Sequence, residues 1–199
     1  PSSLHTAGRT ARRLLEESRE SLAECLGAHA TEIVFTSGGT EANNLILLGT
    51  AGARPERPRV AIGGGEHPSV AGVVDHLPGR VDVLRLDATG RLRDGQLAVL
   101  TERTALVSVL LVNNETGVVQ PLDEVLSAGR AVGAWTHTDA VQAFGHLPLD
   151  FGALDLDALT VTAHKVGGPV GIGALVVRRE LTLAAPGFGG GQERRVRSG

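Results

Sequence analysis

The sequence lacks methionine entirely and contains one cysteine, one tryptophan and few aromatic residues. The single cysteine, Cys25, excludes an internal disulfide and fits a reducing compartment, so we expect a cytoplasmic location. No apolar run reaches the ~20 residues of a membrane-spanning helix, so we expect no membrane partner. The formal net charge of −3 provides no basic surface for nucleic acid. The 42% of hydrophobic residues is ordinary for a globular protein.

Lysine is almost absent as well. Of the 19 basic residues, only Lys165 is a lysine and the others are arginines. Arginine stays protonated at physiological pH and cannot attack a carbonyl, whereas a lysine can lose its proton and form an imine. Lys165 is therefore either a surface lysine that survived by chance or a reactive amine. The chain lacks an initial methionine, begins with Pro-Ser-Ser and stops at Arg-Ser-Gly, so we expect it to be a fragment of a longer protein.

Hydrophobic periodicity predicts strands that alternate with helices. The expected helices are Arg9–Leu26, a segment running through Leu48, His67–Leu77, Asp94–Leu100 and Leu122–Val132, and the expected strands are Glu32–Thr36, Arg59–Ile62, Val81–Leu86, Thr104–Val112, Ala134–Thr138, Leu156–Thr162 and Gly173–Val177. This alternation indicates βαβ units and a mostly parallel sheet. The last two strands are joined by a glycine-rich loop without a helix, which favours an antiparallel pair and so a mixed sheet. We expect one domain over residues 1–199.

The first helix is expected to present Leu14, Leu15, Leu22 and Leu26 on one face and to end at Gly27. Cys25 is expected to be a small buried residue of that helix.

Polar residues gather where the predicted strands end, and ligands of open α/β sheets bind at the carboxyl ends of strands. Five such clusters follow strands, namely Ser37–Glu41, Glu66–Ser69, Asn113–Gly117, Asp139–Gln142 and Thr162–Lys165. Each has a structural alternative. The first could be a helix cap on Ser37 or Thr40, and the second and fourth could also begin helices. The third could be an Asx turn, and the fifth a turn between strands.

Together the five clusters contain reactive and ligand-binding groups that a hydrophobic core does not need. A glycine-rich turn at a helix N-terminus binds anions, and a histidine can stack on a flat ring or move protons. The carboxylate of Asp139 can keep a pyridine nitrogen protonated, and Lys165 can form an imine. This set matches the needs of pyridoxal 5′-phosphate (PLP).

The motifs, in their order, resemble those of the cysteine desulfurases, in the class V aminotransferase group of fold-type I PLP enzymes. The resemblance is carried by Pro1–His5, Thr36–Glu41, Glu66–His67, Val112–Gly117, Asp139–Gln142, His164–Lys165, Gly189–Glu193 and Arg197–Gly199. It implies an α/β fold with three αβα layers around a mostly parallel, mixed sheet. This would be the PLP-binding large domain of such an enzyme, without its first strand and most of its small domain.

The resemblance also implies a role for each site residue. Lys165 would hold the cofactor as a Schiff base and act as acid and base, and Asp139 would pair with the pyridine nitrogen. His67 would stack on the ring and assist proton transfer. Gln142 would contact the ring hydroxyl oxygen, and Asn114 would lie beside the ring and the substrate carboxylate. The phosphate would be bound by Gly39, Thr40, Thr162 and His164.

The activity implied by the resemblance is conversion of L-cysteine to L-alanine, with sulfur passed to an enzyme cysteine as a persulfide. That sulfur would feed iron–sulfur cluster assembly or tRNA thiolation through an acceptor or scaffold protein, and the enzyme would be a homodimer. The family often has alanine in place of Gly39, and Ser-Gly-His-Lys in place of Thr162–Lys165. Its catalytic cysteine and its substrate-binding arginine would lie beyond Gly199, so this fragment alone would be inactive. Alternatives are a selenocysteine lyase or aminotransferase of the same class, and a non-catalytic truncated protein.

Overall fold

The computed structural model describes residues 5–198, so the outermost residues of the expected domain, 1–4 and 199, lie outside the described residues. Their part in the resemblance is therefore not observed. The strands are β1 (Ile33–Thr36), β2 (Arg59–Gly63), β3 (Arg80–Leu84), β4 (Thr104–Ser108), β5 (Trp135–Asp139), β6 (Ala158–Thr162), β7 (Gly173–Val177), β8 (Gly191–Gln192) and β9 (Arg197–Ser198). The first seven form one sheet in the order β1-β7-β6-β5-β4-β2-β3, and β8 pairs with β9.

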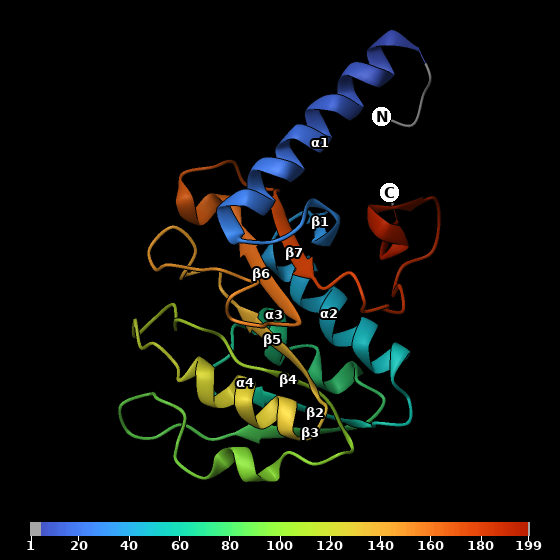
Figure 1. Ribbon diagram of the computed structural model, residues 1–199. Helices are drawn as coiled ribbons and strands as arrows, with labels where there is room; N and C mark the ends of the chain where they lie inside the picture. Colours follow the sequence, from blue (N-terminus) through green and yellow to red (C-terminus); the bar gives the residue numbers. More distant parts are fainter. Residues whose placement is uncertain (1–4, 199) are drawn as a thin grey trace.

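Four α-helices accompany these strands within the described residues (Figure 1). They are α1 (Thr6–Leu26), α2 (Gly39–Ala53), α3 (Pro68–Ala71) and α4 (Leu122–Ala131). Short 3₁₀ turns cover Ala30–Glu32, Val74–His76, Gln96–Val99, Ala163–Val166 and Glu193–Arg195. None of the helices combines the length and the apolar character that crossing a membrane would require.

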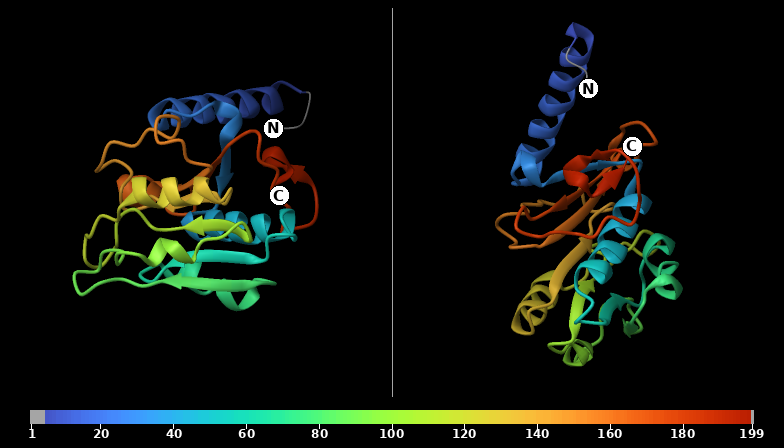
Figure 2. Two further views of the ribbon diagram at one scale, coloured as in Figure 1. Left: turned by 60° about the horizontal axis from the view of Figure 1, so that its bottom comes forward. Right: turned by 90° about the vertical axis from the view of Figure 1, so that its right-hand side faces the viewer.

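Helices cover both faces of the sheet, which gives the three layers expected from the sequence (Figure 2). Successive strand residues point to opposite faces. On β7, Leu175 packs in the cluster that contains the apolar side of α2, while Val176 packs in the cluster that contains Leu26 of α1 and Leu126 of α4. The strands are therefore apolar on both sides, as buried strands of a mostly parallel sheet must be.

The strand directions confirm a mostly parallel, mixed sheet. Strands β2 to β6 run parallel to one another, and β7 is antiparallel to β6, with Thr162 opposite Gly173. Strand β7 also pairs with β1 in the antiparallel sense, so it lies between β6 and the first strand of the chain. The pairing of β1 with β7 is a long-range contact that hydrophobic periodicity does not encode.

Several predicted boundaries are wrong. The helix expected over His67–Leu77 ends at Ala71, because Gly72 and two β-branched valines follow. The helix expected over Asp94–Leu100 is only the 3₁₀ turn Gln96–Val99. The strand expected over Thr104–Val112 ends at Ser108, although the N–H groups of Val109 and Leu111 still donate to β5 and its end.

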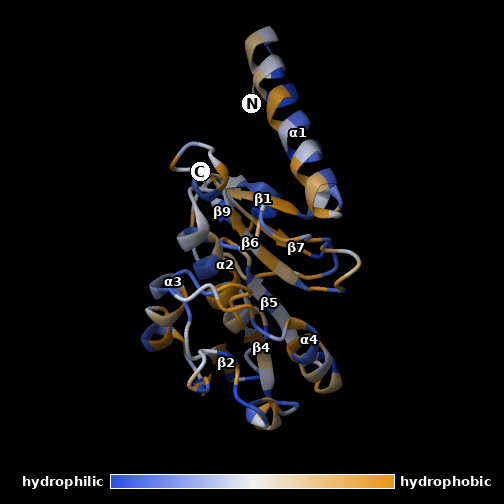
Figure 3. Ribbon diagram, turned by 90° about the vertical axis from the view of Figure 1, so that its left-hand side faces the viewer, coloured by the Kyte–Doolittle hydropathy of each residue, from blue (hydrophilic) through white to orange (hydrophobic). Residues whose placement is uncertain are grey.

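Helix α1 ends as predicted at Gly27, which adopts the left-handed conformation with φ of 62°. Its first half extends beyond the sheet (Figures 1 and 3). Leu26 is fully buried, but Leu14 is 54% exposed, so the predicted apolar face is buried only at its C-terminal end. Cys25 is exposed, contrary to the buried position expected for it, because it lies on the outward side of the last turn.

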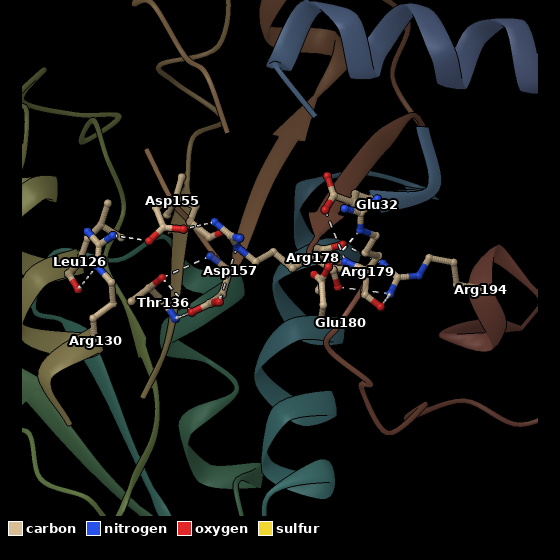
Figure 4. A network of polar contacts seen from close by, with 12 residues as sticks. Glu32, Leu126, Arg130, Thr136, Asp155, Asp157, Arg178, Arg179, Glu180 and Arg194 are labelled. Carbon is tan, nitrogen blue, oxygen red and sulfur yellow. Dashed lines mark hydrogen bonds and ion pairs between the residues drawn. The ribbon is translucent and has the colours of Figure 1, made fainter. Parts of the chain in front are cut away.

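A polar network holds together the ends of β5, β6 and β7 on the side opposite to their predicted clusters (Figure 4). Asp157 accepts hydrogen bonds from the N–H and hydroxyl of Thr136, at 2.8 and 3.1 Å. Asp155 binds both Arg178, beyond β7, and Arg130 of α4. These hydrogen bonds and ion pairs connect the amino-terminal ends of β5 and β6 to the end of β7 and to α4. The network lies away from the carboxyl ends of β5 and β6, where the predicted clusters are.

Candidate functional site

A pocket of about 170 Å³ lies at the carboxyl ends of the strands, beside the start of α2. All nine site residues predicted from the sequence line it, and they come from five separate clusters. The lining comprises Gly39, Thr40, Asn43, His67, Ser69, Leu110, Val112, Asn114, Asp139, Val141, Gln142, Thr162, His164 and Lys165. The fold thus brings together residues that are up to 126 positions apart, from Gly39 to Lys165.

Asp139 forms the buried floor of the pocket, with 7% of its surface exposed. One carboxylate oxygen accepts a hydrogen bond from the N–H of Val141 at 2.9 Å, and the other accepts one from the amide of Asn43 at 2.7 Å. Burial raises the pKa of Asp139, against the lowering effects of these two donors and of nearby His67. The carboxyl group is therefore held in one orientation at the end of β5.

The N-terminus of α2 borders one side of the pocket. Its N-cap is Gly38, with φ of 153°, and no side chain caps the helix. Neither Ser37 nor Thr40 takes the capping role considered as an alternative. A Cβ on Gly39 would lie 3.0 Å from a methyl group of Val141, so the chain approaches the end of β5 closely here. Uncapped N–H groups at a helix start suit an anionic ligand.

Thr162 and His164 line the pocket at the end of β6, where Gly173, the partner of Thr162 in the sheet, packs against Gly38 at the start of α2. The Thr162 hydroxyl oxygen is 3.0 Å from Nδ1 of His164 and donates to the carbonyl of Ile172 at 3.1 Å. Since its one proton is used on Ile172, the imidazole of His164 is the donor in the first contact. Lys165 follows in the 3₁₀ turn Ala163–Val166, with its side chain on the exposed rim of the pocket.

The remaining predicted residues come from two turns. His67 caps the short helix α3 with Nδ1, which accepts from the N–H of Ser69 at 3.1 Å, and it lines the pocket as well. The oxygen of the Asn113 side chain accepts from the N–H groups of Glu115 and Thr116, both at 2.9 Å. This Asx turn, considered above as an alternative, places the next residue, Asn114, at the pocket.

Sequence reasoning missed two polar residues of the lining. Asn43 is completely buried and Ser69 is 7% exposed, and their side chains are hydrogen-bonded to each other at 2.8 Å. Asn43 could have been noticed because it interrupts the otherwise apolar helix that runs through Leu48. Ser69 carried no separate signal, since a serine in a first helical turn is ordinary.

Glu66, next to His67, is a third residue without a predicted role. Its Oε1 accepts from the N–H of Leu110 at 2.7 Å, and its buried Oε2 has no partner within residues 5–198. Burial, and secondarily the charge of Asp139, raises the pKa of Glu66 to about 8. A neutral carboxylic acid therefore lies behind the pocket.

Cys25 is distant from this chemistry in the fold. It borders a different, open hollow with residues 144–150, and it is not part of the pocket lining. The one thiol of the sequence is thus not presented to Lys165 or Asp139.

Comparisons with known proteins show which family the chain belongs to. Residues 1–198 match the family model "Aminotransferase class-V". The "IscS-like cysteine desulfurase" of Mycobacterium tuberculosis is 44% identical over all of this chain and 53% of its own length. The "Putative cysteine desulfurase IscS 1" of Bacillus subtilis is 42% identical, with 54% of its length covered. The chain therefore spans about half the length of these curated relatives.

Solved structures give the same result. The structure titled "SspA in complex with cysteine" superposes with a TM-score of 0.93 at 35% identity, over all of this chain and 59% of that one. A "NIFS-like protein" superposes with a TM-score of 0.94 at 34% identity, over all of this chain and 57% of that one. Both the sequence match and the fold lead to one conclusion: the chain belongs to the aminotransferase class-V family.

Proposed function

We propose that this chain is the PLP-binding large domain of a cysteine desulfurase. The observation that carries the proposal is that the one lysine of the sequence lines the same small pocket as the buried carboxylate of Asp139 and the uncapped start of α2. Relatives at 42–44% identity bear the name cysteine desulfurase, and one structural neighbour was solved with cysteine.

The residues present fit the cofactor. A phosphate needs donors, and the pocket offers uncapped helix N–H groups and the hydroxyl of Thr40. On binding, Thr162 and His164 would turn to the phosphate the hydrogen bonds that they donate here to Ile172 and to Thr162. A pyridine nitrogen needs an acidic partner, and Asp139 has a buried carboxyl group already fixed by Val141 and Asn43. The primary amine of Lys165 matches an aldehyde.

In the proposed mechanism each residue has a defined task. When bound, PLP supplies an aldehyde carbon for amines and an electron sink for the α-carbon of the substrate. Asp139 would hold the proton on the ring nitrogen, His67 would cover the ring, and Nζ of Lys165 would take and return the α-carbon proton. Gln142 and Asn114 would orient the ring hydroxyl and the substrate carboxylate.

The overall reaction we propose for the whole protein breaks the carbon–sulfur bond of L-cysteine and forms a sulfur–sulfur bond. A cysteine thiol of the enzyme takes the sulfur as a persulfide, and L-alanine leaves. Because Cys25 lies outside the pocket, we assign this thiol to the part of the whole protein beyond residue 199. The persulfide would serve iron–sulfur cluster assembly or tRNA thiolation in the cytoplasm.

We also propose that the whole protein is a homodimer with the pocket near the subunit interface. The loop after Lys165 exposes apolar side chains at the rim, with Val170 82% and Ile172 46% exposed. Exposed apolar residues that cluster beside a site are typical of interaction surfaces.

Absorbance of the chain titrated with PLP tests the cofactor proposal. We expect a yellow species that borohydride bleaches, with the reduced cofactor found by mass spectrometry on the peptide containing Lys165. Lys165→Ala should bind PLP without either signal. Borohydride labelling that persists in Lys165→Ala would refute the assignment. In the whole protein, release of alanine and sulfide from L-cysteine distinguishes a desulfurase from an aminotransferase or a non-catalytic protein.

A further inference from the structure

Asn43 is a polar residue at a position that otherwise suits an apolar one. Its neighbours on α2, Ala42, Leu45 and Ile46, belong to the core, and Asn43 itself has no exposed surface. Burying an amide costs free energy unless hydrogen bonds compensate for the lost water. The contacts of this side chain therefore indicate what it does.

Both amide hydrogens of Asn43 are used. Nδ2 lies 2.7 Å from Oδ2 of Asp139 and 2.8 Å from Oγ of Ser69. The amide oxygen, Oδ1, is buried and has no partner in the described part of the chain. Turning the amide over would place this oxygen against the carboxylate of Asp139, where two acceptors would face each other, so the orientation is determined by Asp139.

The chain of donors continues from Ser69 to His67. Because Oγ of Ser69 accepts from Asn43, its own proton is free for Nδ1 of His67, which is 2.8 Å away. The N–H of Ser69 also donates to Nδ1, at 3.1 Å. A nitrogen that accepts from two donors carries no proton itself, so the neutral ring bears its proton on Nε2.

We propose that Asn43, acting through Ser69, is a positioning residue that holds the carboxylate of Asp139 in place and selects the Nε2–H tautomer of His67. One buried amide thus fixes both the carboxylate of Asp139 and the tautomer of His67. The inference rests on the proposed function, which gives these two groups separate roles. Asp139 also interacts electrostatically with His67 and with the carboxyl group of Glu66, and both residues remain in every variant below.

The test uses the cofactor-free chain, so it does not depend on activity. Long-range ¹H–¹⁵N spectra give the tautomer of His67, and carboxyl ¹³C shifts follow the titration of Asp139. In Asn43→Leu, which has a similar size and suits the core, Asp139 loses a donor and we expect about tenfold weaker acidity, one pH unit. In both Asn43→Leu and Ser69→Ala we expect some of the Nδ1–H tautomer of His67 to appear.

Asn44→Ala is the matched control. Asn44 lies next to Asn43 on α2, but its side chain donates only to the backbone carbonyls of Thr40 and Ser69, at 2.8 and 3.1 Å. We expect this variant to leave both spectra unchanged. An unchanged Asp139 titration in Asn43→Leu, or a wild-type tautomer in both network variants, overturns the inference, as does an equal effect of Asn44→Ala.

The two proposals fail in different ways. If the wild-type chain does not bind PLP while the spectra respond as expected, the function is wrong and the positioning role stands. If PLP binds at Lys165 but the spectra do not respond, the positioning role is wrong. In the PLP-loaded chain, we also expect the pH dependence of cofactor absorbance to shift in Asn43→Leu and not in Asn44→Ala.

Discussion

Two carboxyl groups, those of Asp139 and Glu66, lie at or behind the pocket, and burial raises the pKa of each. Asp139 is buried but receives two hydrogen bonds, whereas Oε2 of Glu66 receives none within residues 5–198. Although part of Glu66 reaches the surface, its unpaired oxygen does not, so the carboxyl group favours its neutral form.

Glu66→Gln should flatten the pH dependence of stability between about pH 5 and 8. The pKa of Glu66 is raised to about 8, so its stabilising contribution is complete below its unfolded value of 4.5 and is lost as the pH rises through 8. Between about pH 5.5 and 7, where the group is protonated in the folded state and ionised in the unfolded state, it should lower the free energy of unfolding by about 1.4 kcal/mol per pH unit. Urea denaturation at several pH values measures the slope. An identical slope in the wild type and the variant would contradict the assignment.

His137, on β5 with Asp139, is another titratable group that is buried in the sheet. It is fully buried and contacts hydroxyl oxygens on both neighbouring strands, Ser108 at 2.8 Å and Thr160 at 3.0 Å. Burial lowers the pKa of His137 to about 3, so the ring is neutral in the folded protein. His137 therefore adds no positive charge near Asp139, which lies two residues further along β5.

Among the strands, β1 lies at one edge of the seven-stranded sheet and, within residues 5–198, pairs only with β7. Two side chains from distant segments satisfy that edge. Arg19 of α1 donates to the carbonyl of Ile33, and Glu193 accepts from the N–H of Phe35, both at 2.8 Å. Arg19 and Glu193 also bind each other through two contacts of 2.8 Å, so the edge is covered by an ion pair.

Arg19→Ala should destabilise the chain by roughly 3 kcal/mol, because it leaves the carboxylate of Glu193 largely enclosed and without its cation. The double variant Arg19→Ala/Glu193→Ala should lose much less than the sum of the two single changes. Urea denaturation of the four proteins gives this coupling energy. Losses that add up would indicate that Arg19 and Glu193 do not act as a unit. Arg13→Ala, which breaks an exposed ion pair with Glu17, serves as the control.

The sequence was informative wherever a property is local. The Gly27 helix end, the alternation of strands and helices, and the antiparallel strand after Lys165 all follow from nearby residues. The nine pocket residues were found because each follows a strand, and parallel strands bring their carboxyl ends together. Their chemical roles remain predictions.

What the sequence could not provide depends on contacts between distant residues. The pairing of β1 with β7 joins residues more than a hundred positions apart. The role of Asn43 depends on meeting Asp139 and Ser69 in space. The exposure of Leu14 depends on which part of α1 rests on the sheet, since the helix pattern continues equally into the half that extends beyond it.

For the molecule as a whole, the exposed apolar loop beside Lys165 predicts self-association. Burying a valine contributes about 1.5–3 kcal/mol, so Val170→Asp should weaken dimerisation at least about tenfold. Light scattering after size exclusion, over a range of concentrations, measures the effect. Val83→Asp, at a position 55% exposed on β3, is the control. A wild-type chain that stays monomeric, or equal effects of both variants, would contradict a dimer formed through this loop.

The position of β7 between β6 and β1 also constrains the order in which the protein can form during synthesis. β1 leaves the ribosome well before the strand with which it pairs within residues 5–198, because that strand spans Gly173–Val177. At roughly 5–20 residues per second, β1 must wait on the order of ten seconds before that partner is made. Through this interval its backbone is unpaired, so nascent chains stalled before Gly173 should be the species most dependent on chaperones.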